Sequence, residues 1–284
     1  MHSRPQAVLQ KDLQALLALL RDQIATSALH QRAREFTPYL GSGKMLRARL
    51  ALRLGAANGV RPAVRHAAAA AVELIHAASL LHDDVIDGGL IRRGIPTFWK
   101  AYGTSGAILL GDLILFKAMH LIHATGQLPL LAEFIELSGV VCEAEAEQEL
   151  IRRNKPPTWQ QAVQIARRKT GALFACAAVT AGRNAAQKNA LREAGYLVGT
   201  AYQIADDILD GSCNEHKAGK TLGTDHARGK TTAAVRSPAA ARRHLASLSR
   251  NSTKLLNPWP RLQQAWQAYL DEDFLPVIHA LLGD

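Results

Sequence analysis

The hydrophobic positions of this chain recur with the spacing of an α-helix along almost its whole length. Apolar residues three or four positions apart, with polar residues between them, predict amphipathic helices. Pro62 opens one long apolar run, and Gly88 follows its end, which are favoured places for these residues at helix termini. No segment has the strict alternation that predicts a strand. The expected helices are residues 7–24, 44–57, 62–87, 105–124, 129–154, 159–181, 187–210, 236–249 and 260–282, with a loop over 211–231.

The composition agrees with an all-α fold in a single domain. Of the 284 residues, 48% are hydrophobic and only 5% are aromatic, which favours helices over strands. No linker rich in Pro, Gly or Ser divides the chain, so residues 1–284 are expected to form one domain. The N-terminus does not have the pattern of a signal peptide, and no uncharged apolar run reaches the roughly 18 residues of a membrane span. The three cysteines are scattered and lack metal-binding spacing, which favours a reducing, cytoplasmic location.

The formal net charge of +10 indicates an anionic partner. Basic residues are not gathered in a tail but recur between the expected helices and beside two acidic strings. We therefore favour a phosphorylated small molecule over nucleic acid, with a solvated basic surface as the alternative.

The two acidic strings share the pattern Asp-Asp-x-x-Asp, at residues 83–87 and 206–210. On a helix, positions four apart share a face, so Asp83 lies beside Asp87 and Asp206 beside Asp210. Stacked carboxylates repel one another unless a cation joins them, and Mg²⁺ takes oxygen ligands together with substrate phosphates. The alternative is a pair of solvated acidic helix ends.

Basic and polar residues surround these strings. His76 lies two helical turns before Asp83, and Arg92-Arg93 follow after a short turn. Guanidinium groups beside a carboxylate-bound cation suit a diphosphate. The other motifs in this part of the chain are Gly-x-Gly-Lys-x-x-Arg from Gly41 to Arg47, Leu-Gly-Asp at 110–112, Lys-Thr at 169–170, Tyr-Gln at 202–203, and Gly-Lys-x-x-Gly-x-Asp-x-x-x-Gly-Lys from Gly219 to Lys230.

In order and spacing, these motifs resemble those of the trans-isoprenyl diphosphate synthases, the polyprenyl synthetase family. Motif details are most similar to members that make medium-length and long chains. The resemblance implies an all-α bundle around a deep central cavity, the type I isoprenoid synthase fold, and a homodimer. It also implies a Mg²⁺-dependent prenyltransferase that condenses isopentenyl diphosphate head-to-tail with an allylic diphosphate. About two to three Mg²⁺ ions per active site are expected, with Mn²⁺ as an alternative ion.

The same resemblance implies roles for individual residues. The metal site would comprise Asp83, Asp84, Asp87, Asp206, Asp207 and Asp210, with Asp84, Asp207 and Asp210 acting through water or neighbouring ligands. The allylic diphosphate would be held by Arg92, Lys169, Lys220 and Lys230. The isopentenyl diphosphate would be held by Lys44, Arg47, His76 and Arg93. The catalytic residues would be Lys169, Thr170, Tyr202 and Gln203, and the last three of these would face the reacting carbons.

Product length is expected to depend on the helix below the first acidic string. One helical turn rises about 5.4 Å, roughly one isoprene unit, so Ser79 and Ala78 form the first floor under Asp83. Short-chain members commonly carry a bulky aromatic residue here. Small residues therefore predict a C20 or longer all-trans product, with a C15 farnesyl diphosphate synthase as the alternative. The small residues at 67–71 have a purely structural explanation too, namely close helix packing.

The chain departs from the family pattern at several positions. Met45 stands where Arg is usual, Ala48 where Pro is usual, and Ala144 where Gly is usual. The region after about residue 232 is also shortened. Two other function classes remain open: a class I terpene cyclase, which normally has a different second metal motif, and a non-catalytic partner subunit of a heteromeric synthase, which tends to lose the acidic strings. Membrane contact is expected to be at most transient.

Overall fold

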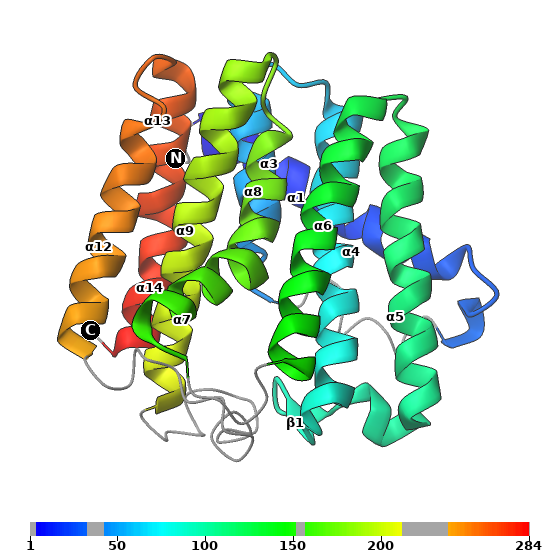
Figure 1. The fold of residues 1–284 in the computed structure, drawn as a ribbon. Coiled ribbons are helices and arrows are strands. Elements are labelled where there is room, and N and C mark those ends of the chain that lie inside the picture. Colours follow the sequence, from blue (N-terminus) through cyan, green and yellow to red (C-terminus); the bar gives the residue numbers. More distant parts are fainter. Residues whose placement is uncertain (1–3, 33–42, 152–156, 212–237, 284) are drawn as a thin grey trace.

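The structure, a computed structural model, describes residues 4–32, 43–151, 157–211 and 238–283. The described part is a bundle of roughly parallel and antiparallel helices, so the all-α prediction is confirmed (Figure 1). The longer helices are α1 (Arg4–Ala25), α3 (Leu46–Ala57), α4 (Pro62–Asp87), α5 (Phe98–Ala124), α6 (Leu128–Leu150), α9 (Ala185–Gly211), α12 (Pro238–Lys254) and α13 (Pro260–Tyr269). The shorter ones are η1 (His30–Arg32), α7 (Trp159–Ala166), η3 (Arg167–Gly171), α8 (Ala172–Val179), η5 (Leu270–Phe274) and α14 (Leu275–Leu282).

Local signals located the ends of α4 correctly. Pro62 occupies its first turn, and Gly88 ends it in the left-handed conformation with φ 63°. Several other expected helices differ from the prediction; the 129–154 helix ends earlier, at Leu150, and the 236–249 helix runs on to Lys254. The 105–124 helix begins earlier, at Phe98, and is kinked at Gly103, where φ is 80°. The 159–181 and 260–282 helices each contain a π-helical turn, η3 and η5. Such turns depend on tertiary packing and leave no local signal.

A short antiparallel hairpin after α4 was not predicted. It pairs β1 (Ile91–Arg92) with β2 (Ile95–Pro96), and two-residue strands are too short to show an alternating pattern. Thr97 Oγ1 and Trp99 Nε1 both donate hydrogen bonds to the carbonyl of Gly89, at 2.7 and 2.8 Å. These bonds fix the hairpin against the carboxyl end of α4.

Helices α4 and α8 lie at the centre of the bundle. Every residue of α8 is buried, and the alanines at 67–71 in α4 are at most 6% exposed. Alanine lets neighbouring helices approach closely, and α4 packs against α1, α3, α5 and α8. The close-packing explanation of these alanines is therefore sufficient for their burial.

The N-terminal helix α1 is attached to α4 by a buried ion pair. Asp12 accepts hydrogen bonds from Arg65 at 2.8 and 2.9 Å and lies 2.7 Å from His66 Nε2. Burial opposes ionisation of Asp12, but the bonds from Arg65 and His66 outweigh it and lower the pKa of this carboxyl. A charged Asp12 therefore stabilises the contact between the two helices.

Two helices, α4 and α5, are long and apolar enough to cross a membrane by length and composition alone. In their most apolar windows, 67% of α4 but only 33% of α5 is buried inside the bundle. The low value for α5 means that the described residues leave a large part of this apolar helix uncovered.

Candidate active site

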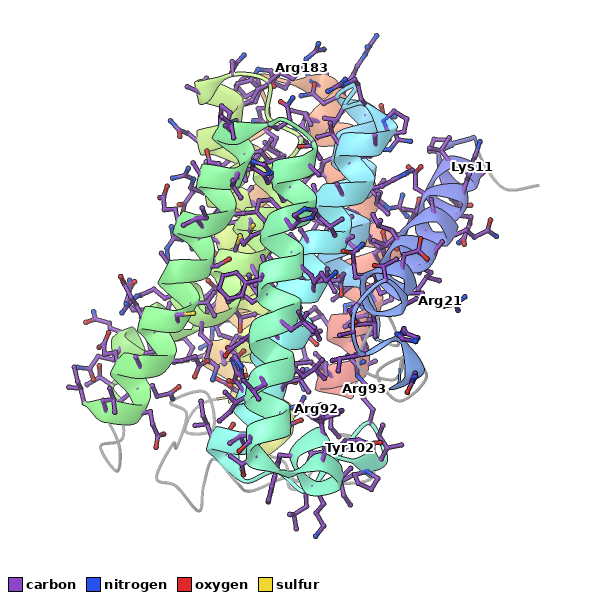
Figure 2. The ribbon with its side chains drawn as sticks, turned by 90° about the vertical axis from the view of Figure 1, so that its right-hand side faces the viewer. Lys11, Arg21, Arg92, Arg93, Tyr102 and Arg183 are labelled. Carbon is purple, nitrogen blue, oxygen red and sulfur yellow. The ribbon has the colours of Figure 1, made fainter. Side chains whose placement is uncertain are left out.

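The carboxyl ends of α4 and α9 lie at the same end of the bundle, where the hairpin also lies next to α4 (Figure 1). Each end carries one of the acidic strings. Figure 2 shows Arg92 and Arg93 near this end and Arg183 at the opposite end. The fold therefore brings together two motifs that are more than a hundred residues apart in the sequence.

Asp83 lies in a crowded electrostatic environment at the end of α4. Burial raises its pKa to about 6. The carboxylates of Glu145 and Asp87 raise it as well, while Lys169 and Arg92 partly offset these effects. Burial and the neighbouring carboxylates make the ionised form of Asp83 unfavourable. A bound cation would stabilise the ionised carboxylate and offset its repulsion from Glu145 and Asp87.

Asp84 has a different environment from Asp83. It is 4% exposed, and both of its carboxylate oxygens accept hydrogen bonds from Arg92 Nε, at 2.8 and 2.9 Å. Arg92 Nη2 adds a contact of 2.7 Å. Because Asp84 is bonded to the hairpin, its geometry fits the indirect role expected for it. Arg92 likewise reaches the site with part of its guanidinium already engaged.

Lys169 lies in the π-helical turn η3, with its ammonium 2.6 Å from Glu145 Oε1. Burial alone would favour the neutral amine, but Asp83 and Glu145 outweigh it and raise the pKa of Lys169. The ammonium therefore stays charged next to the first acidic string. Glu145, from α6, had no role assigned from sequence, although it lies in the acidic segment around Ala144.

A chain of hydrogen bonds connects η3 with the second acidic string. Thr170 Oγ1 donates to Gln203 Oε1 at 2.5 Å, and Gln203 Nε2 donates to Asp207 Oδ1 at 2.8 Å. The two bonds together fix the orientation of the Gln203 amide. Nearby, the ring of Tyr202 lies 5.9 Å from that of Phe174. Thr170, Tyr202 and Gln203 are thus brought together as expected from their motifs.

Close contact between helices makes this hydrogen-bond chain possible. A Cβ on Gly199 would lie 2.6 Å from Cα of Gly171 and 3.0 Å from the carbonyl oxygen of Thr170. A Cβ on Gly195 would lie 2.5 Å from Cα of Ala175. Only glycine fits at these two positions, so α9 can approach η3 and α8 closely enough for side-chain contact.

The four residues expected to hold isopentenyl diphosphate also lie near one another. Burial lowers the pKa of His76 well below its ordinary value, and Arg47 and Arg93 lower it further. His76 is therefore neutral and can donate one hydrogen bond. Burial lowers the pKa of Lys44, while Asp206 partly opposes this. Lys44 thus lies within electrostatic range of the second acidic string.

Arg47 is held against an aromatic face. Its guanidinium carbon lies 4.8 Å from the centre of the Phe174 ring, and Glu73 lies within its electrostatic range. Glu73 Oε1 accepts a hydrogen bond of 3.0 Å from the backbone N–H of Ala48. A proline at 48, as is usual in the family, would have no N–H for this bond. The alanine of this chain thus lets Glu73 stabilise the first turn of α3.

Arg93 reaches the same region from the hairpin. It has φ 52°, an uncommon left-handed conformation for a residue with a side chain. A Cβ on Gly43 would lie 2.7 Å from Nη2 of Arg93, so the guanidinium lies directly against the segment that leads into α3. The Gly-x-Gly-Lys motif thus leaves room for an arginine from a different part of the chain.

Three of the predicted site residues cannot be placed completely. Lys220 and Lys230 lie outside the described residues, as does the expected loop over most of 211–231. Asp210 lies in α9, but its side chain is outside the described part. Asp206 and Asp207 are partly buried at the same helix end. Among the described residues, no three His, Cys, Asp or Glu side chains are gathered closely enough to enclose a metal ion by themselves. Mg²⁺ ordinarily completes its coordination with waters and substrate phosphates.

The residues expected to limit product length lie on α4, about one helical turn before Asp83 in the sequence. Ala78 is 3% exposed, and Ser79 donates a hydrogen bond of 2.9 Å from Oγ to the carbonyl of His76. Ser79 is partly exposed. Both side chains are small, and the hydroxyl of Ser79 is bonded within its own helix.

The comparisons with known proteins agree with this geometry. The family model for the polyprenyl synthetases matches residues 30–254. The octaprenyl diphosphate synthase of Haemophilus influenzae is 36% identical over 197 residues, covering 68% of this chain and 60% of that protein. The geranylgeranyl diphosphate synthase of Mycobacterium tuberculosis is 33% identical over 250 residues, covering 81% of this chain and 70% of that protein. The chain thus spans about 60% of the length of the octaprenyl diphosphate synthase.

A solved structure extends the similarity to almost the whole fold. The polyprenyl synthase of Caulobacter crescentus, crystallised with calcium and isoprenyl diphosphate, has a TM-score of 0.81 and 25% identity. The similarity covers 98% of this chain and 97% of that structure. On its motifs, its fold and these matches, this chain belongs to the polyprenyl synthetase family.

Proposed function

We propose that this protein joins isopentenyl diphosphate head-to-tail to an allylic diphosphate and releases an all-trans polyprenyl diphosphate. The observation that carries the proposal is the pairing of an acidic site with a separate basic site at one end of the bundle. The acidic site comprises the ends of α4 and α9, with Lys169 beside Asp83. The basic site gathers Arg47, His76 and Arg93. Two such sites are what a reaction between two diphosphates requires.

The relatives support this assignment. Two of them are named as synthases of octaprenyl and geranylgeranyl diphosphate, and the solved polyprenyl synthase holds calcium and isoprenyl diphosphate. Because the chain spans only part of the first relative, its substrates and a cytoplasmic location remain part of the proposal. The six aspartates of the two strings would hold Mg²⁺, with Asp84, Asp207 and Asp210 in supporting positions.

The first step breaks the allylic C–O bond, and the electron pair leaves with the diphosphate. Bound Mg²⁺ would neutralise the charge that grows on the leaving group. Lys169 is kept protonated by Asp83 and Glu145, so its positive charge is present throughout this step. Arg92 adds the part of its guanidinium not bonded to Asp84, and Lys220 and Lys230 are assigned to the same diphosphate. These cations stabilise the departing diphosphate more than the intact substrate.

The second step joins the two carbon chains. The oxygens of Thr170 and Gln203 present dipoles to the allylic cation without offering a reactive anion. The isopentenyl double bond attacks the cation, a new C–C bond forms, and a proton is lost. The released diphosphate accepts this proton, so no strongly basic side chain is needed. His76, neutral because of its environment, donates a hydrogen bond to the isopentenyl diphosphate rather than acting as a base.

We infer a product of C20 or longer from the small side chains of Ala78 and Ser79. The control for the test is Ser27→Phe, in the turn after α1 and outside the α4 helix. Ser79→Phe should shorten the product by one or more isoprene units, because the ring would fill the space under Asp83. Chromatography of the radiolabelled products measures this. If the Ser79→Phe enzyme makes a product as long as that of the wild type, Ala78 and Ser79 do not limit product length.

A homodimer is also part of the proposal. Leu109 and Phe116 of α5 are 68% and 73% exposed, and Leu128 and Ile135 of the adjacent α6 are 61% and 56% exposed. Large apolar side chains exposed on neighbouring helices are a typical contact surface between protein chains. A second copy of the chain is the expected occupant of this surface.

One assay separates the remaining functions. Purified protein is incubated with Mg²⁺, radiolabelled isopentenyl diphosphate and an allylic primer. A synthase incorporates the label into a longer diphosphate, a terpene cyclase releases hydrocarbon from the primer alone, and a non-catalytic subunit does neither. Asp83→Ala and Asp206→Ala should abolish incorporation while circular dichroism remains that of the wild type. Normal turnover in either variant would refute the metal assignment.

A further inference from the structure

Two buried polar atoms near the basic site have no hydrogen-bond partner among the described residues. They are Nε of Arg47 and the hydroxyl of Tyr269. Unpaired buried polar atoms are rare in folded proteins, and each one calls for a physical explanation. Their occurrence together, on residues from opposite ends of the chain, suggests a shared role.

Aromatic contacts connect Tyr269 with Arg47. Tyr269 ends α13 and is 0% exposed, with its ring 6.1 Å from that of Phe274. Phe274 meets Phe174 edge-on at 6.4 Å, and Phe174 carries the guanidinium of Arg47 on its face. The C-terminal helices therefore form the wall behind Arg47.

The charged groups that act on Tyr269 also connect it with Arg47. Burial raises the pKa of Tyr269 well above its ordinary value, and Asp273 raises it further, whereas Arg47 lowers it. The hydroxyl thus stays protonated and lies within electrostatic range of Arg47. A protonated tyrosine hydroxyl keeps lone pairs that accept a hydrogen bond from an arginine N–H. Glu73 already has a partner in the N–H of Ala48.

We propose that Tyr269 is a positioning residue for Arg47: its hydroxyl accepts a hydrogen bond from Nε when the outer nitrogens of Arg47 hold the isopentenyl diphosphate. This inference rests on the proposed function. With one face on Phe174 and Nε bonded, the guanidinium plane has one orientation, and its outer edge is free for two parallel bonds to a phosphate. The C-terminal helix α13, which carries Tyr269, thereby becomes part of the substrate site.

Tyr269→Phe tests this proposal, because it keeps the ring and removes only the hydroxyl. Loss of a hydrogen bond to a charged group should raise the Kd of isopentenyl diphosphate about tenfold in calorimetric titration. The KM for this substrate should rise by a similar factor, while kcat and the KM for the allylic diphosphate stay the same. The Tm should not fall, because the lost hydroxyl had no partner in the free protein.

Ser252→Ala is the matched control. Its buried hydroxyl accepts a bond of 3.0 Å from Trp266 Nε1, so it belongs to the same C-terminal packing but has a partner. Its removal should lower the Tm without changing either KM. Tyr269 is a structural residue, and the proposal is wrong, if Tyr269→Phe lowers the Tm without changing either KM. The same holds if Tyr269→Phe binds isopentenyl diphosphate as tightly as the wild type does.

Arg47→Ala distinguishes failure of this inference from failure of the proposed function. If Arg47→Ala binds isopentenyl diphosphate as tightly as the wild type, the assigned diphosphate site itself is wrong. If Arg47→Ala weakens binding and Tyr269→Phe does not, only the role of Tyr269 is refuted. The double variant should bind no more weakly than Arg47→Ala, because Tyr269 acts through Arg47; additive losses would contradict this.

Discussion

Replacing Asp83 by asparagine should make the metal-free protein more stable while removing its activity. Burial raises the pKa of this carboxyl from 3.8 to about 6, with Glu145 and Asp87 adding to the effect. One pKa unit corresponds to about 1.4 kcal/mol, so ionised Asp83 destabilises the folded protein by about 3 kcal/mol at neutral pH. Because Asp83 is partly exposed, screening by water makes this value an upper limit.

The effect has a definite pH dependence. Below pH 3.8 Asp83 is protonated in both the folded and the unfolded protein, so it does not destabilise the fold. As the pH rises from 3.8 through about 6, the unfolded protein loses this proton more readily, and the folded protein becomes less stable relative to it. The gain of the Asp83→Asn variant should therefore be largest at about pH 7.5, roughly half as large at about pH 5, and absent below pH 3.8.

Urea denaturation in the presence of EDTA, at about pH 7.5 and about pH 5, measures this difference. Asp22→Asn, at an exposed position of α1, is the control and should leave the free energy of unfolding unchanged. Addition of Mg²⁺ and inorganic diphosphate should stabilise the wild type and have less effect on Asp83→Asn. An Asp83→Asn variant less stable than the wild type at about pH 7.5 without metal would refute the electrostatic reasoning.

Three further predictions concern packing, charge and assembly. Gly199→Ala should lower activity and decrease the free energy of unfolding by about 1–3 kcal/mol, because the new Cβ would clash with the backbone of η3. Gly139→Ala is the control: a Cβ there meets nothing within 4 Å, so the free energy of unfolding should increase by about 0.5–1 kcal/mol in the same urea titration. Asp12→Asn should cost about 1–3 kcal/mol at neutral pH by weakening the bond to Arg65. Because the pKa of Asp12 is lowered, that cost should vanish as the pH falls from 3.8 through the folded value, and a constant cost would contradict the ion-pair explanation. Phe116→Glu should convert a dimer to monomer in light scattering, and an unchanged mass would argue against the α5 surface as the interface.

Much of the site was predictable because its motifs are local. The spacing of Asp83 and Asp87 on one helix face follows from the helical period, and the end of α4 follows from Gly88. The motif resemblance assigned Lys169 and Gln203 to the same site, and the structure brings both near the acidic strings. Such predictions need only a short stretch of sequence or a known order of motifs.

The residues missed by sequence reasoning act across long distances in the chain. Glu145 binds Lys169 from another helix, and Glu73 bonds the N–H of Ala48. The hydroxyl of Tyr269, more than two hundred residues after Arg47, has no motif around it. The two π-helical turns likewise have no local pattern, although one of them carries Lys169.

The sequence by itself determined the helical architecture, both acidic strings and the basic residues that accompany them. These features depend on the helical period and on helix ends, which neighbouring residues specify. Only the tertiary structure decided which charges meet: that Asp84 is bonded to Arg92, that Asp83 is left with its raised pKa, and that an aromatic wall supports Arg47. Burial and proximity set those energies, and both arise only when distant helices pack together.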